Sequence, residues 1–448
     1  MNLFVRLVSV TLLATLSTLC VHTPAHAVTP HQLVEGLNWA ATNRADSWIE
    51  NPSDDAFYQP PAQFDPTPGA IIKTQPAPHL LNVLGPGFRA YAQKIMYTSR
   101  DQDNNPVPVT GYVIEPANPW LGKGEVPTLV FAPGTRGQGN ICAPSRGPWL
   151  TSAVDTADHA IGFNYELPLQ YLAAASGMRV VVTDYIGLGT PGVHTYVNNI
   201  EQAHAVLDAA RAALRVNNLP YNSPVGFYGY SQGGGAVAAA AEHAQSYAPE
   251  LNVKGTFAGA PPADLEKVFF TVDGTILSGV LGMAINGFAA RNMDFKNAIE
   301  KYLTDEGKIF LSRAATSCVP DLALRDGFKA TSEFSTTSRR MGEILLHEPA
   351  IAQTLAQQRI GTMPLNAPMM VGTATADDIV PNDQVQQMAQ DFCAQGGQVL
   401  MRQWDIKPIQ VIPGSALTHS MPLFLAAPES LKYMFDRFND EPAPSNCA

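Results

Sequence analysis

A serine lies at the centre of a glycine-rich turn between two segments of opposite local character. Residues 229–233 read Gly-Tyr-Ser-Gln-Gly, after the apolar, strand-like stretch 224–228 and before the alanine-rich, helix-like stretch 234–246. A strand-to-helix turn strains its central residue, Ser231, and the flanking glycines leave room for the strand and helix to approach. These flanks favour a nucleophile elbow over an inert glycine turn. An elbow aims the hydroxyl, but a separate base must take its proton.

Short apolar runs alternate with helical stretches along much of the chain. A polar turn joins strand-like runs 91–98 and 107–114 into a predicted hairpin, and apolar residues at helical spacing predict a helix over 200–216. The later strand-like runs are 128–132, 179–183, 225–228, 253–258, 368–372 and 399–404. Such strands separated by helices predict a parallel sheet covered on both faces. With the elbow, this pattern predicts an α/β-hydrolase fold, a mostly parallel sheet flanked by helices.

The alternation breaks over residues 264–362, which look mostly helical and contain no clear βα unit. We therefore expect an α/β-hydrolase core in two parts, 28–263 and 363–448, interrupted by a helical cap or lid. The length of 448 residues fits one core with an insertion. Within the cap, the apolar run 268–290 contains Asp273 and several glycines, which favour buried or lid helices over a membrane helix.

The N-terminus has the pattern of a secretory signal. Arg6 precedes an apolar run over 7–21, and residues 25–27 read Ala-His-Ala, the small-x-small pattern that signal peptidase cleaves. The run is too short to span a bilayer comfortably and Pro24 closes it, which disfavours a membrane anchor. We expect residues 1–27 to be removed and the mature chain, without a transmembrane segment, to be secreted or to lie in the cell envelope. The core then begins with an extended segment rich in Pro and Gly.

Signal cleavage would remove Cys20 and leave an even number of cysteines in a chain bound for an oxidising compartment. The remaining cysteines are Cys142, Cys318, Cys393 and Cys447. Their spacing allows any of the three pairings and includes no C-x-x-C motif of a zinc or redox site. We expect two disulfides, with a structural role, and no metal site.

The charge of the chain excludes one class of partner. The formal net charge is −11, and the sequence contains no run of Lys or Arg. A nucleic-acid-binding protein needs a basic footprint, so we expect no nucleic-acid partner. The acidic surface is better explained as a contribution to solubility.

The order of the residues predicts the base. In this fold the acid and then the histidine follow the serine along the chain. Among the 10 histidines, only His419 lies beyond both the cap and the strands that should carry the acid. We expect His419 in a loop at the carboxyl edge of the sheet, where it would take the proton of Ser231.

The acid should come from a loop after a strand, between the cap and His419. Asp377 follows the strand-like run 368–372 in the pattern Asp-x-Ile-Val-Pro, which is common after the penultimate strand of α/β-hydrolases. It would accept the imidazole N–H and fix the tautomer. Asp378 is the main alternative, since Asp is also favoured at helix N-caps. The other candidates are Asp383, Asp391 and Asp405.

An oxyanion hole needs two N–H donors close to the serine. One should come from the residue after it, Gln232, and the other from a loop that follows an early strand. The loop after 128–132 reads Pro-Gly-Thr-Arg-Gly, and we predict Thr135 as this donor, with Gly134 as the close alternative. An ordinary glycine turn remains the other interpretation of this loop.

With these residues placed, the chain resembles the secretory lipase family of α/β-hydrolases, which is represented by the lipase A of a yeast. The segments that carry the resemblance are 57–61, 141–145, 184–187, 229–234, 246–251, 377–381 and His419. The resemblance implies a triad of Ser231, Asp377 and His419, a lid over an apolar acyl pocket, and disulfides Cys142–Cys318 and Cys393–Cys447. One departure is that the family prototype has an acidic residue in its oxyanion loop, where this chain reads Gly-Thr.

We therefore expect a secreted carboxylic ester hydrolase, a lipase or esterase that acts on hydrophobic acyl esters through an acyl-enzyme. No metal or organic cofactor is required for this chemistry. One alternative is a cell-envelope acyltransferase that uses the same triad. Another is a catalytically silent protein that binds envelope lipids. A serine peptidase is less favoured, since the sequence has no signal for a substrate-amine site.

Overall fold

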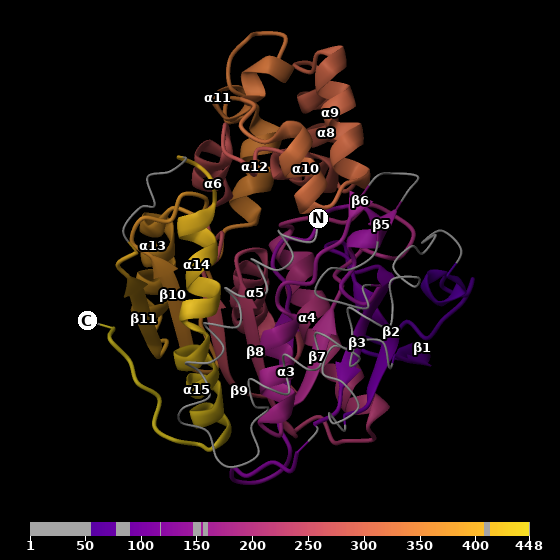
Figure 1. Cartoon of the computed structure of the whole chain (residues 1–448), viewed down its shortest axis with the longest axis vertical. Helices are drawn as coiled ribbons and strands as arrows, with labels where there is room; N and C mark the ends of the chain where they lie inside the picture. Colours follow the sequence, from indigo (N-terminus) through magenta and orange to yellow (C-terminus); the bar gives the residue numbers. More distant parts are fainter. Residues whose placement is uncertain are drawn as a thin grey trace, which may run out of the picture.

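A single mixed sheet forms the centre of the molecule (Figure 1). The structure is a computed structural model, and it describes residues 55–77, 90–116, 118–146, 154–155, 160–406 and 413–447. The predicted signal peptide, Cys20 and residues 28–54 lie outside the described residues. Across the sheet, the strands in this part of the chain are β1 (Ile71–Pro76), β2 (Ala92–Arg100), β3 (Pro106–Ile114), β7 (Arg179–Thr183), β4 (Thr128–Ala132), β8 (Pro224–Tyr230), β9 (Asn252–Gly259), β10 (Met369–Ala374) and β11 (Val399–Trp404).

The strand directions confirm the predicted hairpin and the predicted parallel sheet. β2 and β3 pair antiparallel, with Ala92 opposite Ile114, and β3 pairs antiparallel with β7. From β7 onward every neighbouring pair is parallel. Strands β4, β7 and β11 have the bounds expected from the sequence. A separate short pair, β5 (Val154–Asp155) and β6 (Ala160–Ile161), lies outside this sheet.

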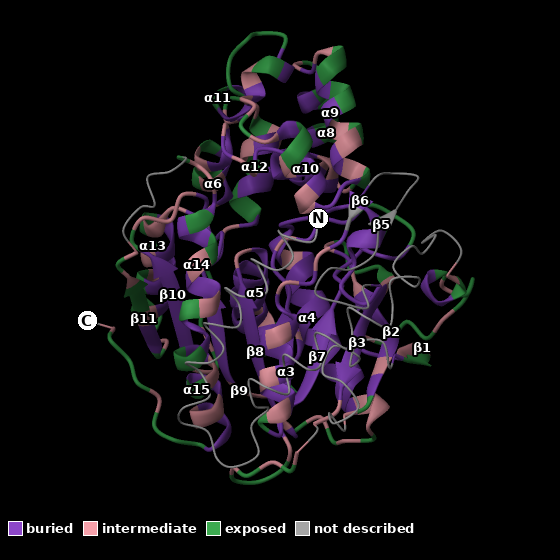
Figure 2. Cartoon of the chain, viewed as in Figure 1, coloured by how far each residue is buried: buried purple, intermediate pink, exposed green. Residues whose placement is uncertain are grey.

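Helices cover both faces of the sheet. Successive strand residues point to opposite sides, so neighbouring residues pack against helices on different faces. In β4, Val130 packs into the apolar cluster that contains α4 (Asn199–Val216), α5 (Gln232–Tyr247) and α13 (Asn382–Ala394). Its neighbour Leu129 packs into a second cluster with α3 (Leu167–Ala175), α14 (Leu417–Leu425) and α15 (Ala427–Phe438). Figure 2 shows the central strands buried, whereas the edge strands β1 and β11 carry exposed residues.

The chain between β9 and β10 forms a helical region above the sheet in Figure 1. Its α-helices are α6 (Leu265–Val272), α7 (Val280–Ala289), α8 (Met293–Glu300), α9 (Asp305–Thr316), α10 (Val319–Asp326), α11 (Met341–Leu345) and α12 (Pro349–Gln357). The two connections to the core meet, since the Ile360 amide donates to the Ala263 carbonyl over 3.1 Å. The division of the chain at 264–362 into a separate cap domain stays a prediction.

The long apolar run 268–290 is divided between α6 and α7. In the described part of the chain, no helix is long and apolar enough to cross a membrane. The disulfides follow the pairing that the family resemblance implied. Cys142 pairs with Cys318, which ties an early loop to the start of α10, and Cys393 pairs with Cys447, which ties α13 to the C-terminal segment.

Candidate active site

Ser231 occupies a strained turn between β8 and α5, as the motif predicts. Its φ of 58° and ψ of −122° lie outside the regions that residues other than glycine usually adopt. Two backbone hydrogen bonds hold this conformation: the Ser231 amide donates to the Gly259 carbonyl at 2.8 Å, and the Gly235 amide donates to the Ser231 carbonyl at 3.0 Å. Gly233 must lack a side chain, because a Cβ there would overlap the carbonyl oxygen of Ala132. The turn presents the partly exposed serine at the carboxyl end of β8.

The structure brings His419 and Asp377 into line with Ser231. The Nε2 atom of His419 lies 2.9 Å from the Ser231 Oγ, and its Nδ1 lies 2.8 Å from Oδ2 of Asp377. The side chain of Asp377 is fully buried, and that of His419 is 6% exposed. A continuous chain of hydrogen bonds therefore runs from carboxylate to imidazole to hydroxyl.

The expected loop at His419 was wrong, since this residue lies in the first turn of α14. Ala416 precedes the helix in a left-handed conformation with φ of 61°. The carboxylate of Asp378 then accepts the amide protons of Ala416 at 2.9 Å and of His419 at 3.2 Å. These bonds satisfy N–H groups that have no partner within a first helical turn. The helix start thus depends on a residue from a distant loop, which the local sequence does not reveal.

The two neighbouring aspartates have different partners. Oδ1 of Asp377 accepts the amide protons of Ile379 and Val380, at 3.0 and 2.8 Å, while its carboxylate faces the imidazole of His419. The carboxylate of Asp378 instead faces the start of α14 and accepts the Thr418 hydroxyl at 2.8 Å. Asp377 is therefore the residue that contacts the imidazole, and Asp378 caps the helix that carries it.

The pKa of His419 reflects competing influences. Burial disfavours the imidazolium and lowers the pKa, but the charge of Asp377, its hydrogen bond to Nδ1 and the charge of Asp378 together raise it above the usual value for histidine. The Tyr230 hydroxyl donates to the His419 carbonyl at 2.7 Å, which joins the histidine to the strand that precedes the serine. The site therefore favours a positive charge on His419.

The loop after β4 lies beside the elbow, and the backbone amides of its residues Gly134 and Thr135 differ in their hydrogen bonding. The amide of Gly134 donates to Oε2 of the buried Glu166 at 3.0 Å. Among the described residues, the amides of Thr135 and Gln232 have no hydrogen-bond partner. Gly134 is thus already engaged, whereas Thr135 and Gln232 keep free donors.

Sequence reasoning missed the residues that support this loop. Arg136 and Glu166 form a buried ion pair with an N–O distance of 3.0 Å, and burial raises the pKa of the Glu166 carboxyl despite this pair. The hydroxyls of Tyr185 and Tyr165 donate to the carbonyls of Pro133 at 2.7 Å and Thr135 at 3.2 Å. Apart from Arg136, which lies in the loop itself, these residues come from segments remote in sequence, so no local motif identifies them.

The side chain of Gln232 is also held by remote residues. Its amide nitrogen donates to Oε1 of Gln202 at 2.8 Å and lies 3.2 Å from Nε2 of His194. The Nδ1 of His194 donates to the Ile186 carbonyl at 3.0 Å, which leaves Nε2 as an acceptor. Burial lowers the pKa of His194 to about 4, so this ring is neutral at ordinary pH.

A family model described as secretory lipase matches residues 155–446, more than half of the chain. The chain belongs to the secretory lipase family. It is 26% identical over 402 residues to a Mycobacterium tuberculosis protein named "probable inactive lipase", with 87% of this chain and 83% of that protein covered. It is likewise 26% identical over 402 residues to the secreted triacylglycerol lipase LIP4 of Malassezia globosa, with 88% and 83% covered.

Solved structures agree with this chain in fold. Candida antarctica lipase A superposes with a TM-score of 0.74 at 22% identity, and 89% of each chain is covered. The rice cell wall degrading esterase LipA of Xanthomonas oryzae superposes with a TM-score of 0.63 at 18% identity, with 83% of this chain and 100% of that chain covered. At these identities the likeness shows the α/β-hydrolase fold alone.

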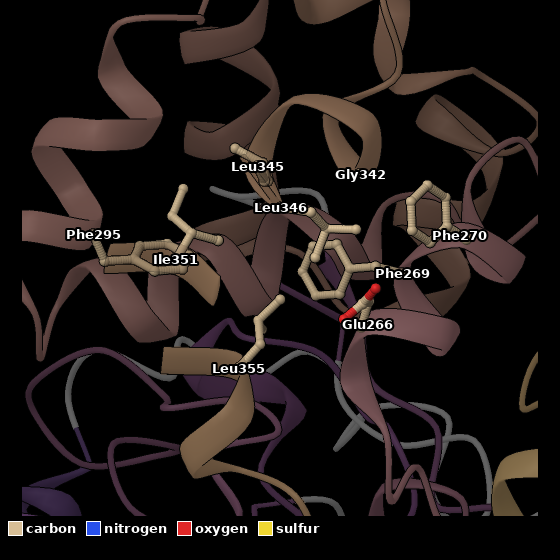
Figure 3. A pocket seen from close by; sticks show the side chains of 9 residues that line it. All are labelled: Glu266, Phe269, Phe270, Phe295, Gly342, Leu345, Leu346, Ile351 and Leu355. Atoms are coloured by element: carbon tan, nitrogen blue, oxygen red, sulfur yellow. The ribbon is translucent and has the colours of Figure 1, made fainter. Parts of the chain in front are cut away.

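The helical region of this chain contains an apolar pocket (Figure 3). It lies between α6, α8, α11 and α12, and one carboxylate, that of Glu266, stands at its side. The apolar lining consists of Phe269, Phe270, Phe295, Gly342, Leu345, Leu346, Ile351 and Leu355. These elements are different from those that carry the serine, the histidine and the aspartate. Among the described residues, no group of three or more His, Cys, Asp or Glu side chains could hold a metal ion.

Proposed function

We propose that this protein is a secreted carboxylic ester hydrolase that cleaves hydrophobic acyl esters with Ser231, His419 and Asp377 as its triad. The hydrogen-bonded chain Asp377–His419–Ser231, at 2.8 and 2.9 Å, is the observation that carries the proposal. A hydroxyl has almost no nucleophilic form at neutral pH unless a neighbouring base removes its proton. Here the base lies within hydrogen-bond distance of the hydroxyl, and a buried carboxylate orients the base.

In the first half-reaction, the Ser231 Oγ attacks the ester carbonyl while Nε2 of His419 takes the hydroxyl proton. The Asp377 carboxylate stabilises the imidazolium through the Nδ1 hydrogen bond. The negative charge that forms on the carbonyl oxygen needs preorganised donors, and the free amides of Thr135 and Gln232 would supply them. The tetrahedral intermediate then collapses, and His419 gives its proton to the leaving alcohol.

In the second half-reaction, water replaces the alcohol. His419 removes a proton from water, the resulting hydroxide attacks the acyl carbonyl, and a second tetrahedral intermediate releases the carboxylic acid. The proton on His419 returns to Ser231 Oγ. The protein ends in its starting protonation state, and the residues named here account for every proton that moves.

The preference for apolar acyl groups is supported by the helical region. The pocket between α6, α8, α11 and α12 is lined almost entirely by apolar side chains. Burying an alkyl chain against such side chains removes apolar surface from water, which is favourable. A relative named as a triacylglycerol lipase also favours a lipid ester as substrate.

Hydrolysis of a series of p-nitrophenyl esters by the mature chain, starting at Val28, tests the proposal. We expect activity that rises with acyl length from acetate and is abolished by Ser231→Ala. Ser246→Ala is the matched control, because Ser246 is exposed and, within the described residues, its hydroxyl bonds only the nearby His243 carbonyl. Retained activity in Ser231→Ala would assign the nucleophile elsewhere. Product analysis with added sugar or lipid alcohols would detect acyl transfer in place of hydrolysis.

A catalytically silent lipid-binding protein is the second candidate, because one relative is named an inactive lipase. A fluorophosphonate probe distinguishes the two, since only an activated serine reacts quickly with it. We expect rapid labelling of the wild-type protein and none of Ser231→Ala. A wild-type protein that binds fatty acids yet resists the probe would favour the silent protein.

A further inference from the structure

The Thr135 side chain forms a hydrogen bond that determines which way its hydroxyl proton points. Its Oγ1 lies 2.8 Å from the hydroxyl of Tyr196. The Tyr196 side chain is buried, with 7% of the residue exposed, and this hydroxyl has no other partner among the described residues. Burial raises the pKa of Tyr196 to about 12, so the phenol keeps its proton at neutral pH.

The hydroxyls of Thr135 and Tyr196 each have one proton to donate. Only one of these two protons can lie in the hydrogen bond between them, so the other must point away from it. If Thr135 donated to Tyr196, the buried phenol proton would be left without an acceptor, which is costly. If Tyr196 donates, its proton is satisfied by Oγ1 and the Thr135 proton is free. Thr135 is only partly buried, so its free proton is available to a group outside this pair. Tyr196 is therefore the donor of this hydrogen bond.

Thr135 belongs to the loop that packs against the elbow. The ring of Tyr196 is 6.1 Å from the ring of His194, which contacts the Gln232 side chain at 3.2 Å. The preceding residue, Gly134, approaches the elbow so closely that a Cβ there would lie 3.2 Å from the Tyr230 carbonyl oxygen. The loop that carries Thr135 thus adjoins the elbow, and Tyr196 lies near the histidine that contacts the Gln232 side chain.

We propose that Thr135 donates its side-chain hydroxyl, in addition to its backbone N–H, to the oxyanion, and that Tyr196 is the positioning residue that directs this hydroxyl. The inference rests on the proposed function and deepens it. With the amide of Gln232, the hole then has three donors. A hydroxyl already oriented before the reaction stabilises the developing charge without reorganisation at that moment.

Two substitutions of Thr135 separate the contribution of its side-chain hydroxyl from that of its backbone N–H. Thr135→Val keeps the shape and the backbone N–H but removes the hydroxyl, whereas Thr135→Ser keeps the hydroxyl. We expect Thr135→Val to lower kcat for p-nitrophenyl butyrate by about 100-fold with little change in KM. Thr135→Ser should stay within about threefold of the wild type. Thermal unfolding midpoints of both variants would exclude loss of the fold as the cause.

A second measurement tests the position of the donor directly. An alkyl boronic acid forms a tetrahedral adduct with an activated serine, and one of its oxygens mimics the oxyanion. Its inhibition constant should rise about 100-fold in Thr135→Val and about tenfold in Tyr196→Phe, in which the threonine proton loses its direction. In both variants KM for the ester should change little, whereas a merely structural role would alter both constants together.

The outcomes separate the two proposals. An inactive wild-type protein would refute the proposed function. An active wild type with Thr135→Val at wild-type kcat and wild-type boronate affinity would refute the third donor alone. A Tyr196→Phe variant that matches the wild type, beside an impaired Thr135→Val, would refute the role of Tyr196 in directing the hydroxyl.

Discussion

Replacement of the buried acid by its amide tests the assignment of the two adjacent aspartates. In Asp377→Asn, the amides of Ile379 and Val380 will hold the new carbonyl oxygen where Oδ1 now lies, because both are donors. The NH2 group must then take the place of Oδ2, which is the nearer carboxylate oxygen to Nδ1 of His419 at 2.8 Å, while Oδ1 lies 3.0 Å from the same nitrogen. Two donors would meet at this shorter contact, which favours the tautomer in which the imidazole accepts at Nδ1.

That change of tautomer places the ring proton on Nε2, the atom that must accept the proton of Ser231. A base with the wrong tautomer cannot act, and the expected fall in kcat is about 10⁴-fold, equivalent to about 5.5 kcal/mol of transition-state stabilisation. The protein should remain folded, because the substitution keeps the side-chain shape and the two amide contacts.

Asp378→Asn is the matched control one residue away. It removes charge from the cap of α14 and leaves a donor facing either the Ala416 amide or the groups of Thr418 and His419. We expect a loss of about 2 kcal/mol in the free energy of unfolding, measured in urea, and a fall in kcat of less than about tenfold.

The pH dependence of kcat/KM gives an independent signature. The base must be neutral, so activity is lost as pH falls through the pKa of His419, which is raised above the usual histidine value. The charge of Asp378 contributes to this raised pKa. Asp378→Asn should therefore shift the acid limb of the profile to lower pH. A fall of about 10³-fold or more in Asp378→Asn, with Asp377→Asn active, would refute the assignment of the acid.

Three further substitutions have expected outcomes. The first is the replacement of both Cys142 and Cys318 by serine, which should lower the free energy of unfolding by up to about 5 kcal/mol, since the disulfide joins residues 176 positions apart. Equal midpoints of urea unfolding for the variant and the wild type would contradict this expectation. Glu166→Ala should lower the free energy of unfolding by about 3 to 5 kcal/mol, because the buried guanidinium of Arg136 loses its charged partner. Glu429→Ala breaks an exposed ion pair and should lower it by less than about 1 kcal/mol. Equal losses for the two variants in chemical denaturation would refute the argument from burial. Gly342→Leu adds bulk to the apolar pocket, because the Phe270 ring would lie 3.1 Å from a Cβ at position 342. This variant should lower activity on long acyl esters relative to short ones by about tenfold. An unchanged chain-length profile would show that the acyl group binds elsewhere.

The parts of the fold that could be predicted are those in which local sequence and tertiary environment agree. The strands β4 and β7 lie between helices on both faces, so all their residues are buried and appear in sequence as apolar runs with polar residues only at their ends. The elbow at Ser231 was predictable because its glycines follow from the turn: a Cβ at Gly229 would overlap the Gly233 carbonyl oxygen, and a Cβ at Gly233 would overlap that of Ala132 in the neighbouring strand. Chain order, a property of the fold, then selected the histidine.

The parts that could not be predicted depend on pairs of residues far apart in the chain. The helical start at His419 requires Asp378, which is 41 residues earlier. The engagement of the Gly134 amide requires Glu166, which is 32 residues later. The side chain of Glu166 is buried and that of Asp378 is partly buried, and sequence alone indicates neither the burial nor the partner of either residue.

Three of the segments that carry the family resemblance hold the structure together away from the reacting groups. The Tyr58 hydroxyl lies 2.9 Å from Oγ of Ser145, the Ser145 amide donates to Asp184 at 2.9 Å, and the Arg146 guanidinium stacks 3.6 Å from the centre of the Tyr58 ring. The carboxylate of Asp184 is fully buried, so every lone pair without a donor would be costly. The Thr110 hydroxyl also donates to it, at 2.7 Å. The cluster thereby fixes the loop that carries Cys142, and through its disulfide the start of α10. A family motif can thus identify a chain through its folding requirements, while the chemistry depends on other residues.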